Sequence, residues 1–539
     1  MSEPVSRRLF VTASAAMAAI SGGLAPLAAE AQTAAVPANG TLSIGIGGAV
    51  TSVDPHFYNA SPNNGLAMHI FDRLVERDAQ ARLQPGLALS WTPVSETVWE
   101  FKLRPGVKWH DGKDFTAEDV AFTVERTPNV PNSPGGFGGF VRSIKRVEIV
   151  DPLTVRFHTE GPAPLVPTDL AAVAVIAKHV NGTATEDYNS GKAAIGTGPY
   201  KLASYTPGDR TELVRNDAWF GPKQPWAKVS YRFLGNDSGR VAALLAGDVD
   251  MIDQVPTSDI AKLRRESRVK VVETQGLRVI YLFPDFSREG PPNFATDLNG
   301  GKLATNPFRN LKFRQALSAA INREALCRQV MEGTAQPTGQ WLAPGTYSHN
   351  PDVKPDTYSP DRAKALLAEA GFPQGLKITL HGPNDRYPND ARIIQAVAQM
   401  WQRVGIQTTV EAAPWASFSA RNARQEFDIR LLGWASTTGE AAYTLVNILS
   451  TYNQASRLGS NNNGRYSNPR LDEVTARATS TLDDAAREKL LQEGVKIAMD
   501  DLAFIPLMQL VNVWAVKRGL DYNARADERS VATEAKPAA

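Results

Sequence analysis

The chain has 539 residues, and 58 Lys and Arg residues stand against 56 Asp and Glu, so its formal charge is +2. This near balance argues against a nucleic-acid-binding protein, which normally carries a clear basic excess. Apolar residues make up 42% of the chain, too many for a disordered protein, and the single cysteine, Cys327, excludes a disulfide framework or a multi-cysteine metal site. One hydrophobic core does not usually organise a chain of this length, so we expect at least two lobes.

The first 31 residues predict a twin-arginine signal peptide. Arg7 and Arg8 precede an apolar, alanine-rich run, and Ala29-Glu30-Ala31 offers a cleavage site of the A-x-A type. Cleavage there would leave a mature chain that starts near Gln32. Because no later apolar run reaches the length of a membrane span, we expect a soluble protein exported to the periplasm.

Alternating residues predict strands in the first part of the mature chain. Residues 41–46 alternate in this way, and in residues 98–103 the side chains of Trp99, Phe101 and Leu103 share one face. The turn at Pro105-Gly106 then predicts a hairpin with a second strand at 107–109. Thr116, with an acid three residues later at Asp119, predicts the start of a helix.

Strands and helices alternate regularly in the later part of the chain. Ser359-Pro360 is typical of a helix start, and Gly371 of its end. A strand at 376–380, a helix at 392–404 and a strand from Ile406 then predict a βαβ unit with parallel strands. A further strand at 427–432 is expected to end at Gly433, and the polar residues 526–539 are expected to be disordered.

No motif for catalysis or for a cofactor is present. The sequence lacks a G-x-S-x-G elbow, an H-E-x-x-H helix and a phosphate-binding P-loop, and no two of its seven histidines stand at a ligand spacing. Cys327 lies on an apolar stripe and is expected to be a buried small hydrophobe. We therefore predict no catalytic residues, no metal and no cofactor.

Eight segments with recognisable patterns occur in order over nearly the whole mature chain. They are Phe71–Asp78, Leu83–Trp91, Trp99–Gly112, Phe115–Val120, Gly196–Tyr200, Ala243–Asp250, Phe313–Arg323 and Ala363–Gly371. Taken together, these segments resemble the periplasmic solute-binding proteins of ABC transporters, of the peptide/nickel-binding type (solute-binding protein family 5).

The resemblance implies an α/β, two-lobed clamp of the periplasmic-binding-protein type II, with an additional subdomain inserted in the first lobe. We place lobe I at residues 32–280 with the insertion at about 76–194, lobe II at 281–501, and a return to lobe I at 502–525. Most of the matching residues identify the fold and need not touch a ligand.

The resemblance also implies a function. Such a protein captures a small solute by closing its lobes and delivers it to an inner-membrane ABC permease with a cytoplasmic ATPase. We expect an oligopeptide or peptide-like cargo, a monomer, and no nucleic-acid partner. The alternatives are an oligosaccharide, an opine-type conjugate or a metal chelate as cargo, or a periplasmic enzyme built on the same fold.

The predicted ligand-binding residues cluster after the strand at 427–432, because open α/β sheets bind ligands at the carboxyl ends of their strands. Trp434 is expected to form a pocket wall, and a Trp packed in the core is the alternative. In peptide-binding relatives, an Asp three residues after the matching Trp holds the α-ammonium of the peptide; here that position is Thr437, which is uncharged. Glu440 is a candidate to supply the missing charge from a different geometry; the alternative is a role in structuring the loop or an exposed position.

Three further positions are weaker candidates for the ligand site. Trp415 and Tyr58 are aromatic residues that could line the pocket. Asp285 lies near the expected crossover between the lobes, where it either shapes the cleft or caps a turn.

Overall fold

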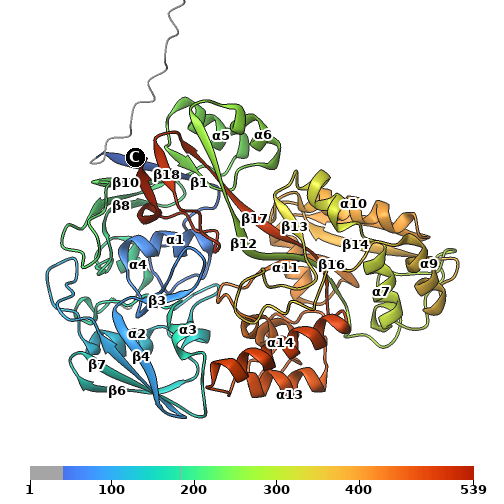
Figure 1. Cartoon of the computed structure of the whole chain (residues 1–539), viewed down its shortest axis with the longest axis horizontal. Coiled ribbons are helices and arrows are strands. Elements are labelled where there is room, and N and C mark those ends of the chain that lie inside the picture. The colour runs from blue at the N-terminus through green and yellow to red at the C-terminus, as the bar shows by residue number, and fades with distance from the viewer. Residues whose placement is uncertain (1–39, 183, 539) are drawn as a thin grey trace, which may run out of the picture. The chain divides into compact units, whose positions relative to one another are not determined.

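The computed structural model describes residues 40–182 and 184–538, so the predicted signal peptide lies outside the described residues. Its main feature is an eleven-stranded sheet, in which the strands follow the order β15-β14-β16-β12-β17-β11-β1-β10-β9-β8 and β13 pairs with β17 (Figure 1). These strands are β1 (Thr41–Ile46), β8 (Tyr200–Thr206), β9 (Arg210–Arg215), β10 (Lys228–Phe233), β11 (Met251–Ile252), β12 (Val269–Pro284), β13 (Ala335–Pro337), β14 (Leu376–Pro383), β15 (Ile406–Ala413), β16 (Ile429–Ala435) and β17 (Ile505–Lys517).

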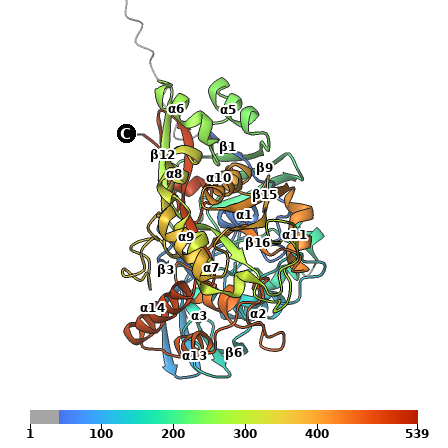
Figure 2. The ribbon, with the colours of Figure 1, turned by 90° about the vertical axis from the view of Figure 1, so that its right-hand side faces the viewer.

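Helices accompany the strands along the whole described chain (Figures 1 and 2). They are α1 (Ser61–Ile70), α2 (Ala117–Arg126), α3 (Val166–Leu170), α4 (Thr185–Asn189), α5 (Asp237–Ala246), α6 (Thr257–Arg265), α7 (Leu311–Ala319), α8 (Arg323–Ala325), α9 (Pro360–Glu369), α10 (Asp390–Gln402), α11 (Trp415–Ala423), α12 (Ala442–Thr444), α13 (Pro469–Ala478) and α14 (Asp484–Asp500). Within the described residues, none of them is both long and apolar enough to cross a membrane.

Two long strands, β12 and β17, connect the two halves of the fold. Strand β12 pairs with β17 from Val269 to Leu282, and its last part, from Arg278 onward, also pairs with β16 on the other side; β17 in turn pairs with β11. Separate apolar cores surround the two ends, one containing Leu42, Ile44 and Val229 and the other Ile280, Leu282 and Leu380. The two-lobed α/β architecture is therefore confirmed, and the expected lobe boundary at 280/281 falls inside the continuous strand β12.

The predicted βαβ unit is confirmed. Strands β14 and β15 pair in parallel along their whole lengths, from Leu376 opposite Ile406 to Pro383 opposite Ala413, and α10 connects them. The preceding helix, α9, starts as predicted, because the Ser359 side chain accepts a hydrogen bond from the Arg362 backbone N–H. Local capping and periodicity were sufficient to place these elements.

A second, antiparallel sheet lies within the expected insertion, with the order β4-β5-β7-β6. Its strands are β4 (Ala88–Ser95), β5 (Val98–Leu103), β6 (Ile144–Asp151) and β7 (Thr154–Thr159). The predicted hairpin is wrong: β5 pairs with β4 and β7, and residues 107–109 contribute only an isolated bridge between Lys108 and Asp114. The turn at Pro105-Gly106 leads into a loop because both edges of β5 are already paired, one with β4 and the other with β7.

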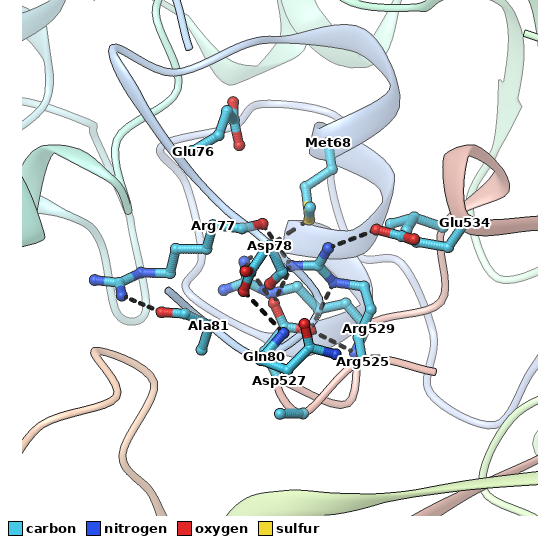
Figure 3. A network of polar contacts seen from close by, with 12 residues as sticks. Met68, Glu76, Arg77, Asp78, Gln80, Ala81, Arg525, Asp527, Arg529 and Glu534 are labelled. Carbon is cyan, nitrogen blue, oxygen red and sulfur yellow. Dashed lines mark hydrogen bonds and ion pairs between the residues drawn. The ribbon is translucent and has the colours of Figure 1, made fainter. Parts of the chain in front are cut away.

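The C-terminal segment is ordered, which corrects the prediction of a disordered tail at 526–539. Strands β18 (Leu520–Tyr522) and β19 (Ala535–Pro537) pair with each other. Arg525, only 2% exposed, forms ion pairs with Asp527 and Glu534 and donates hydrogen bonds to the carbonyl groups of Arg77 and Asp78 (Figure 3). The charges that suggested a solvated tail neutralise one another in a buried network.

Two short antiparallel strands, β2 (Val75–Arg77) and β3 (Leu83–Pro85), pair in the segment that carries Arg77, whose carbonyl group accepts a hydrogen bond from Arg525.

Cys327 is buried, as predicted, and burial raises the pKa of its thiol to about 12. Within the described residues, no group of three or more His, Cys, Asp or Glu side chains is arranged to hold a metal ion.

Candidate functional site

A cavity of about 590 Å³ lies where strands from both halves of the main sheet end. Gly47 follows β1, Gln254 follows β11 and Tyr387 follows β14, while Arg278 comes from β12 and Glu528 from the C-terminal segment. Loops at the ends of strands carry side chains without breaking the sheet ladder, so such a place is suited to a ligand. The volume fits a ligand of a few residues.

Charged groups on the lobe I side of this cavity are held by internal bonds. Arg278 forms an ion pair with Glu528 at 2.5 Å, and Glu528 also accepts a hydrogen bond from the Ser61 hydroxyl. Asp253 accepts a hydrogen bond from the Gly47 backbone N–H at 2.8 Å, and burial raises the pKa of its carboxyl to about 6. These groups position the wall and already have protein partners.

Arg386, in the loop after β14, is different. Its side chain is exposed, and its guanidinium lies 5.5 Å from the ring centre of Tyr387 and 5.4 Å from that of Trp415. No hydrogen bond or ion pair joins its guanidinium to any residue that the structure describes. Arg386 therefore presents a positive charge to the cavity, oriented by the two aromatic rings.

Trp415, one of the predicted ligand residues, does not line this cavity. Its ring packs edge-on against Tyr387, with ring centres 6.2 Å apart, and Tyr387 does line it. Trp415 therefore supports the wall that Tyr387 and Arg386 form.

Trp434 lies on the opposite face of the sheet from Arg278. Strand β16 continues to Ala435, past the predicted end at Gly433, and Trp434 pairs with Val279 while Ala435 pairs with Arg278. Because side chains alternate across a strand, Trp434 points away from Arg278. Its ring stacks on Tyr443 with centres 5.1 Å apart, and its buried Nε1 has no hydrogen-bond partner among the described residues.

Glu440 is 4% exposed and forms an ion pair with Arg487 of α14 at 2.8 Å. Only one carboxylate oxygen takes part; Oε1 is buried without a partner among the described residues. Burial raises the pKa of this carboxyl, and Arg487 opposes that shift. Glu440 is therefore tied to α14, and its role in supplying the charge that Thr437 lacks stays a prediction.

Thr437 and Thr438 follow β16 and are partly exposed. The Thr438 carbonyl accepts a hydrogen bond from Arg77 at 2.9 Å, and the same guanidinium donates to the carbonyl of Thr168 in α3 at 3.1 Å. Arg77 thereby brings the loop after β16 next to α3. In Figure 3 its side chain extends away from the Arg525 network, toward Ala81.

Asp169, the residue after Thr168, was not predicted from the sequence. Burial raises the pKa of its carboxyl to about 8, and Arg142, Glu440 and Arg77 lie within electrostatic range. Its carboxylate makes no hydrogen bond or ion pair with any residue that the structure describes, although its backbone groups bond to Leu165 and Ala172. No sequence signal marks it, since its neighbours come from segments far away along the chain.

Asp285 and Tyr58, the last two predicted residues, have different surroundings. Asp285 is fully buried, and its carboxylate accepts from Ser287 and pairs with Arg288 at 2.6 Å, so it caps a turn. Tyr58 is 37% exposed, forms an isolated bridge to Gly135 and does not line the cavity around Arg386. A ligand contact at Tyr58 stays a prediction.

Comparison with known proteins defines the class. Residues 82–456, well over half of the chain, match the family described as bacterial extracellular solute-binding proteins, family 5. The chain belongs to this family.

Two relatives illustrate its range. The chain is 27% identical over 489 residues to heme-binding protein A of Haemophilus influenzae, covering 84% of this chain and 83% of that one. It is 26% identical over 475 residues to the glutathione-binding protein GsiB of Escherichia coli K12, covering 86% and 88%. The periplasmic binding protein DppA of Helicobacter pylori, solved with the peptide STSA, has the same fold, with a TM-score of 0.77, 23% identity, and coverage of 93% and 98%.

Proposed function

We propose that this chain captures a peptide or peptide-like solute in the periplasm and delivers it to an ABC permease driven by a cytoplasmic ATPase. The observation that carries the proposal is the cavity between strand ends of both lobes, with Arg386 at its wall, oriented by aromatic rings and its guanidinium unpaired among the residues that the structure describes. A guanidinium of this kind suits a carboxylate, the group that every free peptide carries at its C-terminus. Ligand that bridges the two lobes favours the closed form.

A non-peptide cargo is the second candidate, and the uncharged Thr437 favours it. Relatives or structural neighbours of this chain include a heme-binding protein, a protein solved with agropinic acid and a protein solved with Ni(L-His). An opine-type conjugate or a metal chelate would meet Arg386 through its own carboxylates. We propose no catalytic step, and we propose export by a twin-arginine signal and a monomeric state.

Native mass spectrometry of gently purified protein tests the function. A co-purified peptide that is released chemically unchanged, and that rebinds saturably in calorimetry, is the expected result. Recovery of a converted product, with turnover of added ligand, would contradict a transport role. A bound heme, opine or chelate would select the second candidate.

The role of Arg386 has its own test. Arg386→Gln removes the charge but keeps the length of the side chain, so we expect affinity for the identified ligand to fall by about 1.5–3 kcal/mol. Arg403→Gln, at an exposed arginine outside the cavity, is the matched control and should bind like the wild type. Equal affinity of Arg386→Gln and wild type, measured by calorimetry, would remove Arg386 from the site.

A further inference from the structure

Three polar atoms in the stretch that follows Gly433 are buried and unpaired. They are Nε1 of Trp434, Oγ1 of Thr438 and Oε1 of Glu440, none of which has a hydrogen-bond partner among the described residues. Buried polar groups are nearly always paired, because leaving one unpaired costs free energy. Three of them within seven residues indicate a surface built to meet polar atoms of a ligand.

Asp169 belongs to the same region. The Arg77 guanidinium donates to the carbonyl groups of both Thr168 and Thr438, so α3 and the loop after β16 are held side by side. The electrostatic influence of Glu440 reaches Asp169, and that of Asp169 reaches Tyr443. The Asp169 carboxylate nevertheless has no bonding partner in the described chain.

The donors and acceptors in this region favour a cation. Arg77 donates to three carbonyl oxygens, at Ala81, Thr168 and Thr438, and Arg487 pairs with Glu440. The exposed Arg142 lies within electrostatic range of Asp169 but forms no ion pair with it among the described residues. In α3 and residues 434–440, the side-chain oxygens left without a partner among the described residues include those of the Asp169 carboxylate, Oε1 of Glu440 and Oγ1 of Thr438, against one unpaired buried nitrogen, Nε1 of Trp434. Tyr443, whose ring stacks on Trp434, lies within electrostatic range of Asp169, and aromatic faces attract cations.

We propose that Asp169 and Oε1 of Glu440 form a subsite for a primary ammonium group of the solute. The proposal rests on the proposed function of solute capture and deepens it. Position 437 carries an uncharged Thr here, so the negative charge that would face the ammonium is placed instead on Asp169, in α3 of the inserted subdomain. Because Asp169 and Glu440 come from opposite sides of the Arg77 bridge, an ammonium held by both would tie those two segments together.

The test uses the full-length mature protein and an equimolar library of di- to pentapeptides in two forms, with free and with N-acetylated amino termini. Native mass spectrometry ranks what is retained. We expect the wild type to enrich free-amine peptides over their acetylated forms by about tenfold or more, as for a charge-assisted hydrogen bond. Asp169→Asn should lose this preference, and Asp169→Glu should keep part of it.

Asp187→Asn is the control, because Asp187 is an acid on the neighbouring helix α4 whose partner is the exposed Lys192. It should retain the wild-type preference, and melting curves check that all variants are folded.

A second measurement separates binding from a structural role. Since the Asp169 carboxyl has a pKa of about 8, it is largely neutral at pH 7, and an ammonium must displace its proton. Calorimetry in phosphate and Tris buffers should therefore detect proton release for the wild type and less for Asp169→Asn.

The outcomes are distinct. If the wild type retains no peptide of either form, the peptide-binding function and the subsite both fail. If it retains both forms equally, peptide binding stands and the ammonium subsite is overturned. If Asp169→Asn keeps the wild-type preference and the same proton release, Asp169 is not the residue that holds the amine.

Discussion

The ion pair between Glu440 and Arg487 is a stability feature as well as part of the candidate site. Both side chains are almost fully buried, so removing one leaves the other as an uncompensated charge. We expect Glu440→Ala to lower the free energy of unfolding by roughly 3 kcal/mol, measured by urea denaturation. Glu493→Ala, on α14 together with Arg487, removes the exposed ion pair with Arg470 and should remain close to the wild type. Similar losses in the two variants would contradict this interpretation.

The protonation state of His69 affects a hydrogen bond to the C-terminal segment. Its Nδ1 hydrogen-bonds to the Gly65 carbonyl, and its Nε2 accepts from the Ala532 backbone N–H at 2.9 Å. Burial lowers the pKa of this imidazole to about 4, and a proton on Nε2 would remove the acceptor for Ala532.

Because the folded-state pKa lies below the unfolded value of about 6.5, the stability from neutral His69 is present above pH 6.5 and is lost as the pH falls toward 4. Between pH 7.5 and 5.0 that loss is about 2 kcal/mol. We expect His69→Gln to reduce the difference in unfolding free energy between these two pH values by that amount. An unchanged difference, measured by chemical denaturation at both pH values, would contradict the prediction.

At the scale of the element, the start of α2 depends on one carboxylate. Asp119 accepts hydrogen bonds from the backbone N–H groups of Thr116 and Lys178, each at 2.9 Å, so it caps the helix and ties it to the segment after the insertion's strands. We expect Asp119→Ala to lower the free energy of unfolding by about 2 kcal/mol or more, because a buried cap and a second buried donor are lost together.

Glu118→Ala is the matched control for this helix. Glu118 sits beside Asp119 in the same first turn, but among the described residues its carboxylate pairs with the exposed Lys178 ammonium alone. Its removal should leave the denaturation midpoint unchanged. If the two alanine variants unfold alike, the cap is not what stabilises α2.

At the scale of the whole described chain, Arg525 joins the C-terminal segment to residues more than 400 positions earlier. Its guanidinium reaches Asp527, Glu534 and the carbonyl groups of Arg77 and Asp78 (Figure 3). Arg525→Met keeps most of the side-chain volume but leaves those acceptors short of donors. We expect it to lower the free energy of unfolding by roughly 3 kcal/mol.

The corresponding control is Lys536→Met, which changes an exposed charge in the same segment. Thermal melts followed by circular dichroism should separate the two variants, with a lower melting temperature for Arg525→Met alone. A melting temperature of Arg525→Met equal to that of the wild type would show that the C-terminal segment is not held by this network.

The sequence by itself determined the local elements and the family. Strands β1 and β5 have the predicted bounds, and the caps at Thr116 and Ser359 mark helix starts, because these signals act among residues a few positions apart. Tertiary structure alone decided that β5 pairs with β7, that the charged C-terminal segment is buried, and that Asp169 lies near Glu440. Strand partners, burial and the electrostatic surroundings of a carboxyl depend on groups brought together from distant parts of the chain, and no local pattern records them.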